Sequence, residues 1–204
     1  QQRVGEVNGV FRVEGAELRL GRWQDVLGDV GARSVVLTDP PYSEITHAGF
    51  RSGSESFNKG GDGTNNALGY DALTAEELHE FAAWVVRSDP MWAVVFGDDL
   101  GHQMWKAEFR AAGWVTFAPV IWLKVDGPPR MAGEGPSSDA EHITVARPRR
   151  RVREFGGRRG HYLVHTNKSP LPPTQRVVGM KKPEDLKRIL LDYTRPGDLV
   201  VDPY

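Results

Sequence analysis

The sequence contains no cysteine, which excludes disulfide bonds, thiolate zinc sites and cysteine nucleophiles. It contains no apolar run that approaches the roughly 20 residues needed to span a bilayer. No secretory signal opens the chain, so we expect a cytoplasmic protein without a membrane partner. The spacing of the histidines is not typical of metal ligands, so we expect no metal at His47, His79, His102 or His142.

A concentrated block of basic residues is the most prominent compositional feature that is present. The 204 residues carry a net charge of −1, but the segment 142–182 holds eight arginines and three lysines against one acid. That segment therefore carries +10 and the remainder carries −11. A basic block on an acidic body predicts a polyanionic partner that approaches one face.

Short apolar runs alternate with amphipathic helical patterns along the chain. Strands are predicted over 10–13, 17–20, 34–38, 91–96, 114–123, 141–146 and 199–201. Helices are predicted over 24–30, from a capping box at 74–77 to about 87, from 98 or 99 to 113, and from 183 onward. This alternation predicts an α/β fold with a parallel sheet that is covered on both faces.

One short motif indicates a binding or catalytic site. Asp39-Pro40-Pro41-Tyr42 directly follows an apolar strand, and open α/β sheets bind ligands at the carboxyl ends of their strands. Two prolines fix the backbone and remove two N–H donors, so the turn offers acceptors: the Asp39 carboxylate and the Pro40 carbonyl. Such acceptors beside an aromatic ring suit the planar amine of adenine or cytosine. A strand-terminating turn with a surface tyrosine is the alternative.

Companion segments cover nearly the whole chain. They are Leu18–Trp23, Ser34–Tyr42, Val94–Asp98, Phe109–Trp114, Val120–Lys124, Glu141–Ala146, Lys182–Leu190 and Arg195–Tyr204. In this permuted order they resemble the β-class amino-methyltransferases that modify DNA. The resemblance implies a Rossmann-like, mostly parallel, seven-stranded methyltransferase sheet, with a catalytic domain over 1–146 and 180–204 and a small basic target-recognition insert over 147–179.

The resemblance also implies an activity. A methyl group would pass from S-adenosylmethionine to the exocyclic amine of a base flipped out of double-stranded DNA. Asp39, Pro40, Pro41 and Tyr42 would position the attacking nitrogen. The aspartate favours adenine N6, with cytosine N4 as the alternative, and the lack of cysteine independently excludes C5-cytosine methylation. A bacterial or phage-type, nucleoid-associated enzyme is implied, compatible with a homodimer and with a cognate restriction endonuclease.

The cofactor site is expected to draw on both ends of the chain. The residues that match it are Asp39, Lys182, Pro183, Asp202, Pro203, Tyr204, Arg22 and Trp23. Arg22 replaces the acid usual in the family, Trp23 could equally be a core residue, and Lys182 could be a solvated lysine. The glycine-rich continuation of the family's first motif does not follow Tyr204, so these 204 residues alone are expected to bind S-adenosylmethionine weakly.

The basic block occupies the position of the family's target-recognition region. The residues expected to contact DNA are Arg147, Arg149, Arg150, Arg151, Arg153, Arg158, Arg159 and Lys168. A solvated charged loop is the alternative. The glycine-rich stretch 49–69 could close over the flipped base or be a flexible loop.

Two further functions compete with DNA methylation. The resemblance also implies methylation of RNA or protein amines as an alternative, since related Asn/Asp-Pro-Pro-Tyr sites perform it, although the basic insert favours duplex DNA. A non-enzymatic DNA-binding remnant without a cofactor pocket is the other possibility, and DNA binding without cofactor binding would select it.

Overall fold

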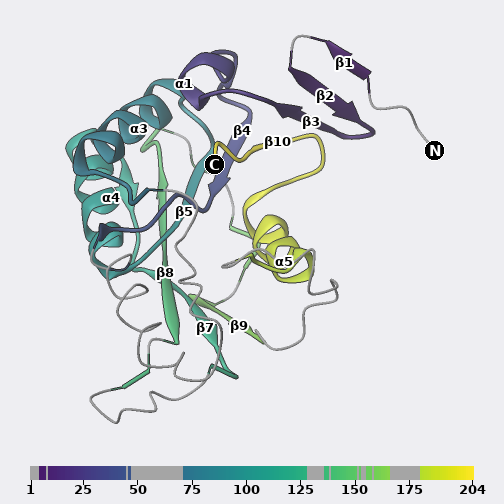
Figure 1. Ribbon diagram of the computed structural model, residues 1–204. Helices are drawn as coiled ribbons and strands as arrows, with labels where there is room; N and C mark the ends of the chain where they lie inside the picture. The colour runs from purple at the N-terminus through teal and green to yellow at the C-terminus, as the bar shows by residue number, and fades with distance from the viewer. Residues whose placement is uncertain are drawn as a thin grey trace, which may run out of the picture.

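A computed structural model describes residues 5–7, 9–44, 46, 71–127, 136–137, 139–150, 152, 155–157, 159–165 and 180–204 (Figure 1). The strands are β1 Gly5–Val7, β2 Val10–Val13, β3 Ala16–Arg19, β4 Ser34–Thr38, β5 Trp92–Gly97, β6 Val115–Thr116, β7 Val120–Lys124, β8 Ala140–Arg147, β9 His161–Val164 and β10 Leu199–Val201. The helices are α1 Trp23–Val26, α3 Ala75–Ser88, α4 Asp99–Ala111 and α5 Pro183–Tyr193.

The strands form two sheets. β1, β2 and β3 form an antiparallel sheet of three strands, and the other seven form the main sheet in the order β10-β4-β5-β8-β7-β9, with β6 paired to β8. β8 is antiparallel to β5, β6 and β7, whereas β10, β4 and β5, like β7 and β9, pair in parallel. Every strand of the main sheet except β8 therefore runs in one direction, which confirms the mostly parallel α/β fold.

Helices cover both faces of the main sheet. Figure 1 shows α3 and α4 on one side and α5 on the other. Side chains alternate along each strand: Val36, Ala93 and Val95 belong to the core cluster with α3 and α4, and their neighbours Val35 and Val94 belong to the cluster with α5. The central strands bury both faces, which explains their unbroken apolar sequences.

The long strand predicted over 114–123 is wrong in one respect, because the structure divides it. Val115 and Thr116 pair with Arg147 and Ala146 of β8, whereas pairing resumes at Val120 opposite Ile143. Residues 117–119 thus lie opposite residues 144–145, so one extra residue forms a bulge. Pro119 has no N–H to donate to a ladder, which favours an interruption here.

Most predicted helix ends are confirmed, and two strands were not foreseen. Thr74 and Glu77 form the capping box of α3, and Asp98 is the N-cap of α4. The helix expected over 24–30 is a single turn, α1. β1 was not predicted, nor was β9, which lies within 147–179 and pairs in parallel with β7 as an edge strand of the main sheet.

The strand directions define two opposite edges of the main sheet. At the carboxyl edge, the chain continues from β4 into 39–74, from β7 into 125–139, from β9 into 165–182 and from β10 into 202–204. The described residues between β8 and β9, which are 148–150, 152, 155–157 and 159–160, lie at the opposite, amino edge. The described residues that follow β4, β7, β9 and β10 thus lie at the edge where α/β sheets bind ligands.

Candidate active site

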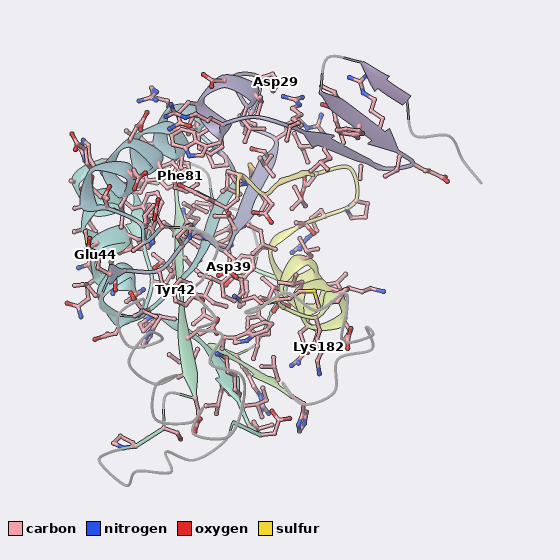
Figure 2. All side chains as sticks on the ribbon, in the orientation of Figure 1. Asp29, Asp39, Tyr42, Glu44, Phe81 and Lys182 are labelled. Carbon is pink, nitrogen blue, oxygen red and sulfur yellow. The ribbon has the colours of Figure 1, made fainter. Side chains whose placement is uncertain are left out.

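Asp39 lies at the carboxyl edge because β4 ends at Thr38. In the main sheet β10 lies beside β4 and parallel to it. Asp202, which follows β10, therefore lies beside the last residues of β4. The Thr38 hydroxyl donates a hydrogen bond to Asp202 Oδ1 at 2.7 Å. Figure 2 shows Asp39 and Tyr42 together at the centre of the molecule. Two carboxylates from opposite ends of the sequence therefore meet beside the Pro40-Pro41 turn.

A network of charged side chains surrounds the Asp39 carboxylate. The Lys181 ammonium donates to Asp39 Oδ2 and also lies 3.2 Å from Glu141 Oε2. The Tyr42 hydroxyl donates to Glu141 Oε2 at 2.8 Å, and Lys124 Nζ lies 2.5 Å from Glu141 Oε1. Two carboxylates, two ammonium groups and a phenol thus form one connected network.

The pKa values of the two carboxyl groups in the network are shifted in opposite directions. Burial raises the pKa of Asp39, and the nearby Lys181 charge only partly offsets this. Burial also acts to raise the pKa of Glu141, but Lys181 and Lys124 together outweigh it and leave that pKa below its usual value. Burial, with the charge of Glu141, raises the pKa of Tyr42 far above its normal range. Tyr42 therefore stays a neutral donor, and Glu141 stays an anion that fixes it.

Asp98 ties the segment after Tyr42 to the start of α4. Its Oδ1 accepts from the Gly101 N–H at 2.7 Å as the helix cap, and its Oδ2 accepts from the Thr46 hydroxyl at 2.5 Å. The Ser43 hydroxyl and backbone N–H also donate to Oδ2. One carboxylate therefore holds both the helix and the segment that carries Tyr42.

We expect the substitution Asp98→Ala to lower the free energy of unfolding by about 2–3 kcal/mol, because a helix cap and several charge-assisted hydrogen bonds are lost. Burial acts to raise the pKa of Asp98, but the hydrogen bonds from Ser43, Thr46 and Gly101 outweigh it and lower that pKa. This stability is thus present above about pH 4 and is lost as the pH falls through the lower folded-state value. Urea unfolding from pH 7 to pH 3 measures both effects.

The control is Asp98→Asn, which keeps a capping oxygen but removes the charge. Its unfolding free energy should depend less on pH below about pH 4 than that of the wild type. Equal acid dependence in the two proteins would contradict this role of the Asp98 charge.

The structure brings together only some of the residues expected to bind the cofactor. Trp23, Asp202 and Pro203 line a cavity of about 480 Å³ that also borders β3, α1 and β10. Trp23 is nonetheless a core residue, since it is only 8% exposed and packs against Phe81 and Trp84.

The other expected cofactor residues are dispersed. Tyr204 packs edge-on against Phe81, with ring centroids 5.3 Å apart, and Arg22 is exposed before α1. Lys182 and Pro183 lie at the start of α5 (Figure 2), where the Lys182 ammonium donates to the His165 carbonyl. Lys182 therefore points to the end of β9, and its neighbour Lys181 reaches Asp39.

The described arginines of the basic block lie away from Asp39. Arg147 ends β8, six residues after Glu141, which corresponds to about 20 Å along the strand. Its guanidinium lies 5.9 Å from the centres of the Trp92 and Phe117 rings. Arg150 forms an ion pair with Asp89 at 2.6 Å, and Arg149 and Arg159 are exposed in the same segment, 148–160. Arg151, Arg153, Arg158 and Lys168 lie outside the described residues, as do 49–69.

Sequence reasoning missed three members of the Asp39 network. The sequence places Lys124 just after the strand predicted over 114–123, Glu141 at the start of the strand predicted over 141–146, and Lys181 in the basic block. Their positions in the sequence could have indicated two of them. Lys124 ends β7 and Glu141 lies near the start of β8, which is antiparallel to β7, so both lie at the carboxyl edge. Nothing in the sequence distinguishes Lys181 from Lys182.

Comparison with solved structures identifies the fold. M1.HpyAVI in complex with S-adenosylmethionine superposes with a TM-score of 0.60 at 18% identity, over 89% of this chain and 76% of the other. A second structure of M1.HpyAVI gives a TM-score of 0.57 at 18% identity, over 89% and 75%. No protein-family model and no curated sequence matches the chain. At this identity the similarity establishes a shared fold.

The described residues contain no group of three or more acidic, histidine or cysteine side chains placed to hold a metal ion. Among them, no helix has the length and apolar character required to cross a bilayer.

Proposed function

We propose that this chain transfers a methyl group from S-adenosylmethionine to the N6 amine of an adenine flipped out of double-stranded DNA. The amine nitrogen would form a bond to the methyl carbon as the carbon–sulfur bond breaks, and the electron pair of that bond would return to sulfur, so that a neutral thioether leaves. The methylated nitrogen would then lose a proton to solvent. The protein's contribution would be to orient the amine and to stabilise the positive charge that develops on it. No covalent intermediate with the protein is required.

The observation that carries this proposal is the acceptor group at the end of β4. The Asp39 carboxylate is 38% exposed, and it lies beside the Tyr42 ring, whose hydroxyl is bound to Glu141. In this proposal the fixed Tyr42 ring would contact a planar base, while the adjacent carboxylate would accept an amine hydrogen. The Pro40 carbonyl supplies the second acceptor, as a neutral exocyclic amine has two hydrogens to donate.

The methyl donor is proposed from the fold and from the residues at the end of β10. M1.HpyAVI binds S-adenosylmethionine, and the cavity here combines the Asp202 carboxylate with the Trp23 ring. These groups fit the polar and aromatic parts of such a donor. The donor supplies an activated methyl group, and Asp202, Pro203 and Trp23 would hold it next to Asp39.

The DNA would approach the carboxyl edge of the sheet, because the base must reach Asp39. The proposed contacts of Arg147, Arg149, Arg150 and Arg159 then require the duplex to extend toward the amino edge, about 20 Å away. A duplex is about this wide, so these arginines would contact flanking phosphates more readily than the target base.

Nucleoside mass spectrometry tests the proposal directly. The protein is incubated with duplex DNA and with S-adenosylmethionine that carries a labelled methyl group, and the DNA is then digested. We expect labelled N6-methyladenine. Labelled N4-methylcytosine would change the substrate to cytosine, and DNA binding without any labelled product would favour a non-enzymatic protein. Parallel reactions with RNA and with protein substrates distinguish the remaining acceptors.

A further inference from the structure

Lys181 occupies an enclosed position in the Asp39 network. Its side chain is only 8% exposed, although lysine is usually solvated. The ammonium lies 4.2 Å from the centre of the Phe96 ring and contacts the Asp39 and Glu141 carboxylates. A charge held this far from water must be compensated by its neighbours, and here two carboxylates and an aromatic face compensate it.

Glu141 does not depend on Lys181 for its partners. Lys124 Nζ lies 2.5 Å from its Oε1, and the Tyr42 hydroxyl lies 2.8 Å from its Oε2. Within the described part of the chain, Asp39 has a single ion-pair partner, which is Lys181. Of the two carboxylates that Lys181 contacts, Asp39 therefore depends on this ammonium more than Glu141 does.

We infer that Lys181 is a positioning residue that holds Asp39 as an oriented, anionic acceptor for the amine of the target base. Its ammonium contacts Oδ2, which restricts the rotation of the carboxylate that would accept the incoming amine. Lys181 contacts neither base nor donor in this role. The role of Asp39 as an acceptor for the base rests on the proposed function, but the effect of the ion pair on Asp39 can be tested without methyl transfer.

Removing Lys181 should change the protonation of Asp39 in a defined direction. The charged and titratable groups that then face Asp39 are Glu141 from β8, Asp202 after β10 and the Tyr42 phenol. Glu141 and Asp202 are carboxyl groups, and the phenol stays neutral. An anionic Asp39 would gain repulsion and lose its counter-ion, so it would take up a proton at a higher pH.

The test compares Lys181→Met with Lys187→Met, a matched control on an exposed position of α5. NMR of the Asp39 side-chain carboxyl carbon follows its titration in the wild type and in both variants. We expect the Lys181→Met midpoint to rise by about one to three pH units, and the Lys187→Met midpoint to match the wild type. An unchanged midpoint in Lys181→Met would overturn the inference, whether or not the protein proves to be a methyltransferase.

The pH profile of methyl transfer provides a second readout. In Lys181→Met the acidic limb should move upward with the Asp39 midpoint, and kcat should recover partly at high pH, where Asp39 is ionised again. A loss of kcat that is the same at every pH would indicate a merely structural role and would also overturn the inference. Absence of activity in the wild type would instead count against the proposed function and would leave the NMR result valid.

Discussion

Replacing Asp39 by alanine should lower the rate of methyl transfer by about 100- to 1000-fold or more, the range found when a preorganised charge-stabilising group is removed. Asp39 is the carboxylate at the end of β4 that remains 38% exposed to an incoming base. Without it, the amine loses an acceptor that orients its lone pair and stabilises its developing charge. Single-turnover incorporation of labelled methyl groups into duplex DNA measures the loss.

DNA binding should be retained in Asp39→Ala, because DNA affinity comes mainly from contacts with phosphates. The control is Asp99→Ala, which removes an exposed carboxylate in the first turn of α4 at the same edge of the sheet. It should keep most of the activity. Equal rates of methyl transfer in Asp39→Ala and the wild type would show that Asp39 takes no part in the reaction. Equal losses of rate in Asp39→Ala and Asp99→Ala would indicate a general electrostatic effect.

The central fold could be predicted because its signals are local. β4 and β5 are short apolar runs, α3 begins with a capping box, and α5 begins with a proline at its first turn. The bulge between β6 and β7 depends on the partner strand, which the sequence of 115–124 does not reveal. β9 was missed because only alternate residues, Tyr162 and Val164, are buried in a short edge strand among basic residues.

The site could be predicted in part for the same reason. The turn 39–42 follows its strand directly, so its place at the carboxyl edge could be derived from chain order. The partners of Asp39 come from β8 and from the segment before α5, and those contacts depend on tertiary packing. The sequence predicts one basic surface, whereas β9 runs between the two edges of the sheet, with Arg159 at the amino edge and Lys181 at the carboxyl edge.

Replacing Phe81 by alanine should lower the free energy of unfolding by about 3–5 kcal/mol, the usual loss for a fully buried phenylalanine. Phe81 is completely buried on α3, where Figure 2 labels it. Its ring packs against four aromatic side chains at centroid distances of 5.3–5.5 Å: Trp23, Trp84, Trp105 and Tyr204. Four rings, from α1, α3, α4 and the segment after β10, would therefore lose their common contact.

Such a loss is large beside a total stability of about 5–15 kcal/mol, and it should lower the melting temperature by about 6–20 °C for a chain of this length. Denaturant unfolding followed by tryptophan fluorescence measures it. The control is Leu191→Ala on α5, where the side chain is 64% exposed and the expected change stays within about 0.5 kcal/mol. A loss below about 1 kcal/mol in Phe81→Ala would mean that the rings close around the vacated space. Because Trp23 belongs to this cluster, the substitution should also disturb the packing behind the proposed cofactor cavity.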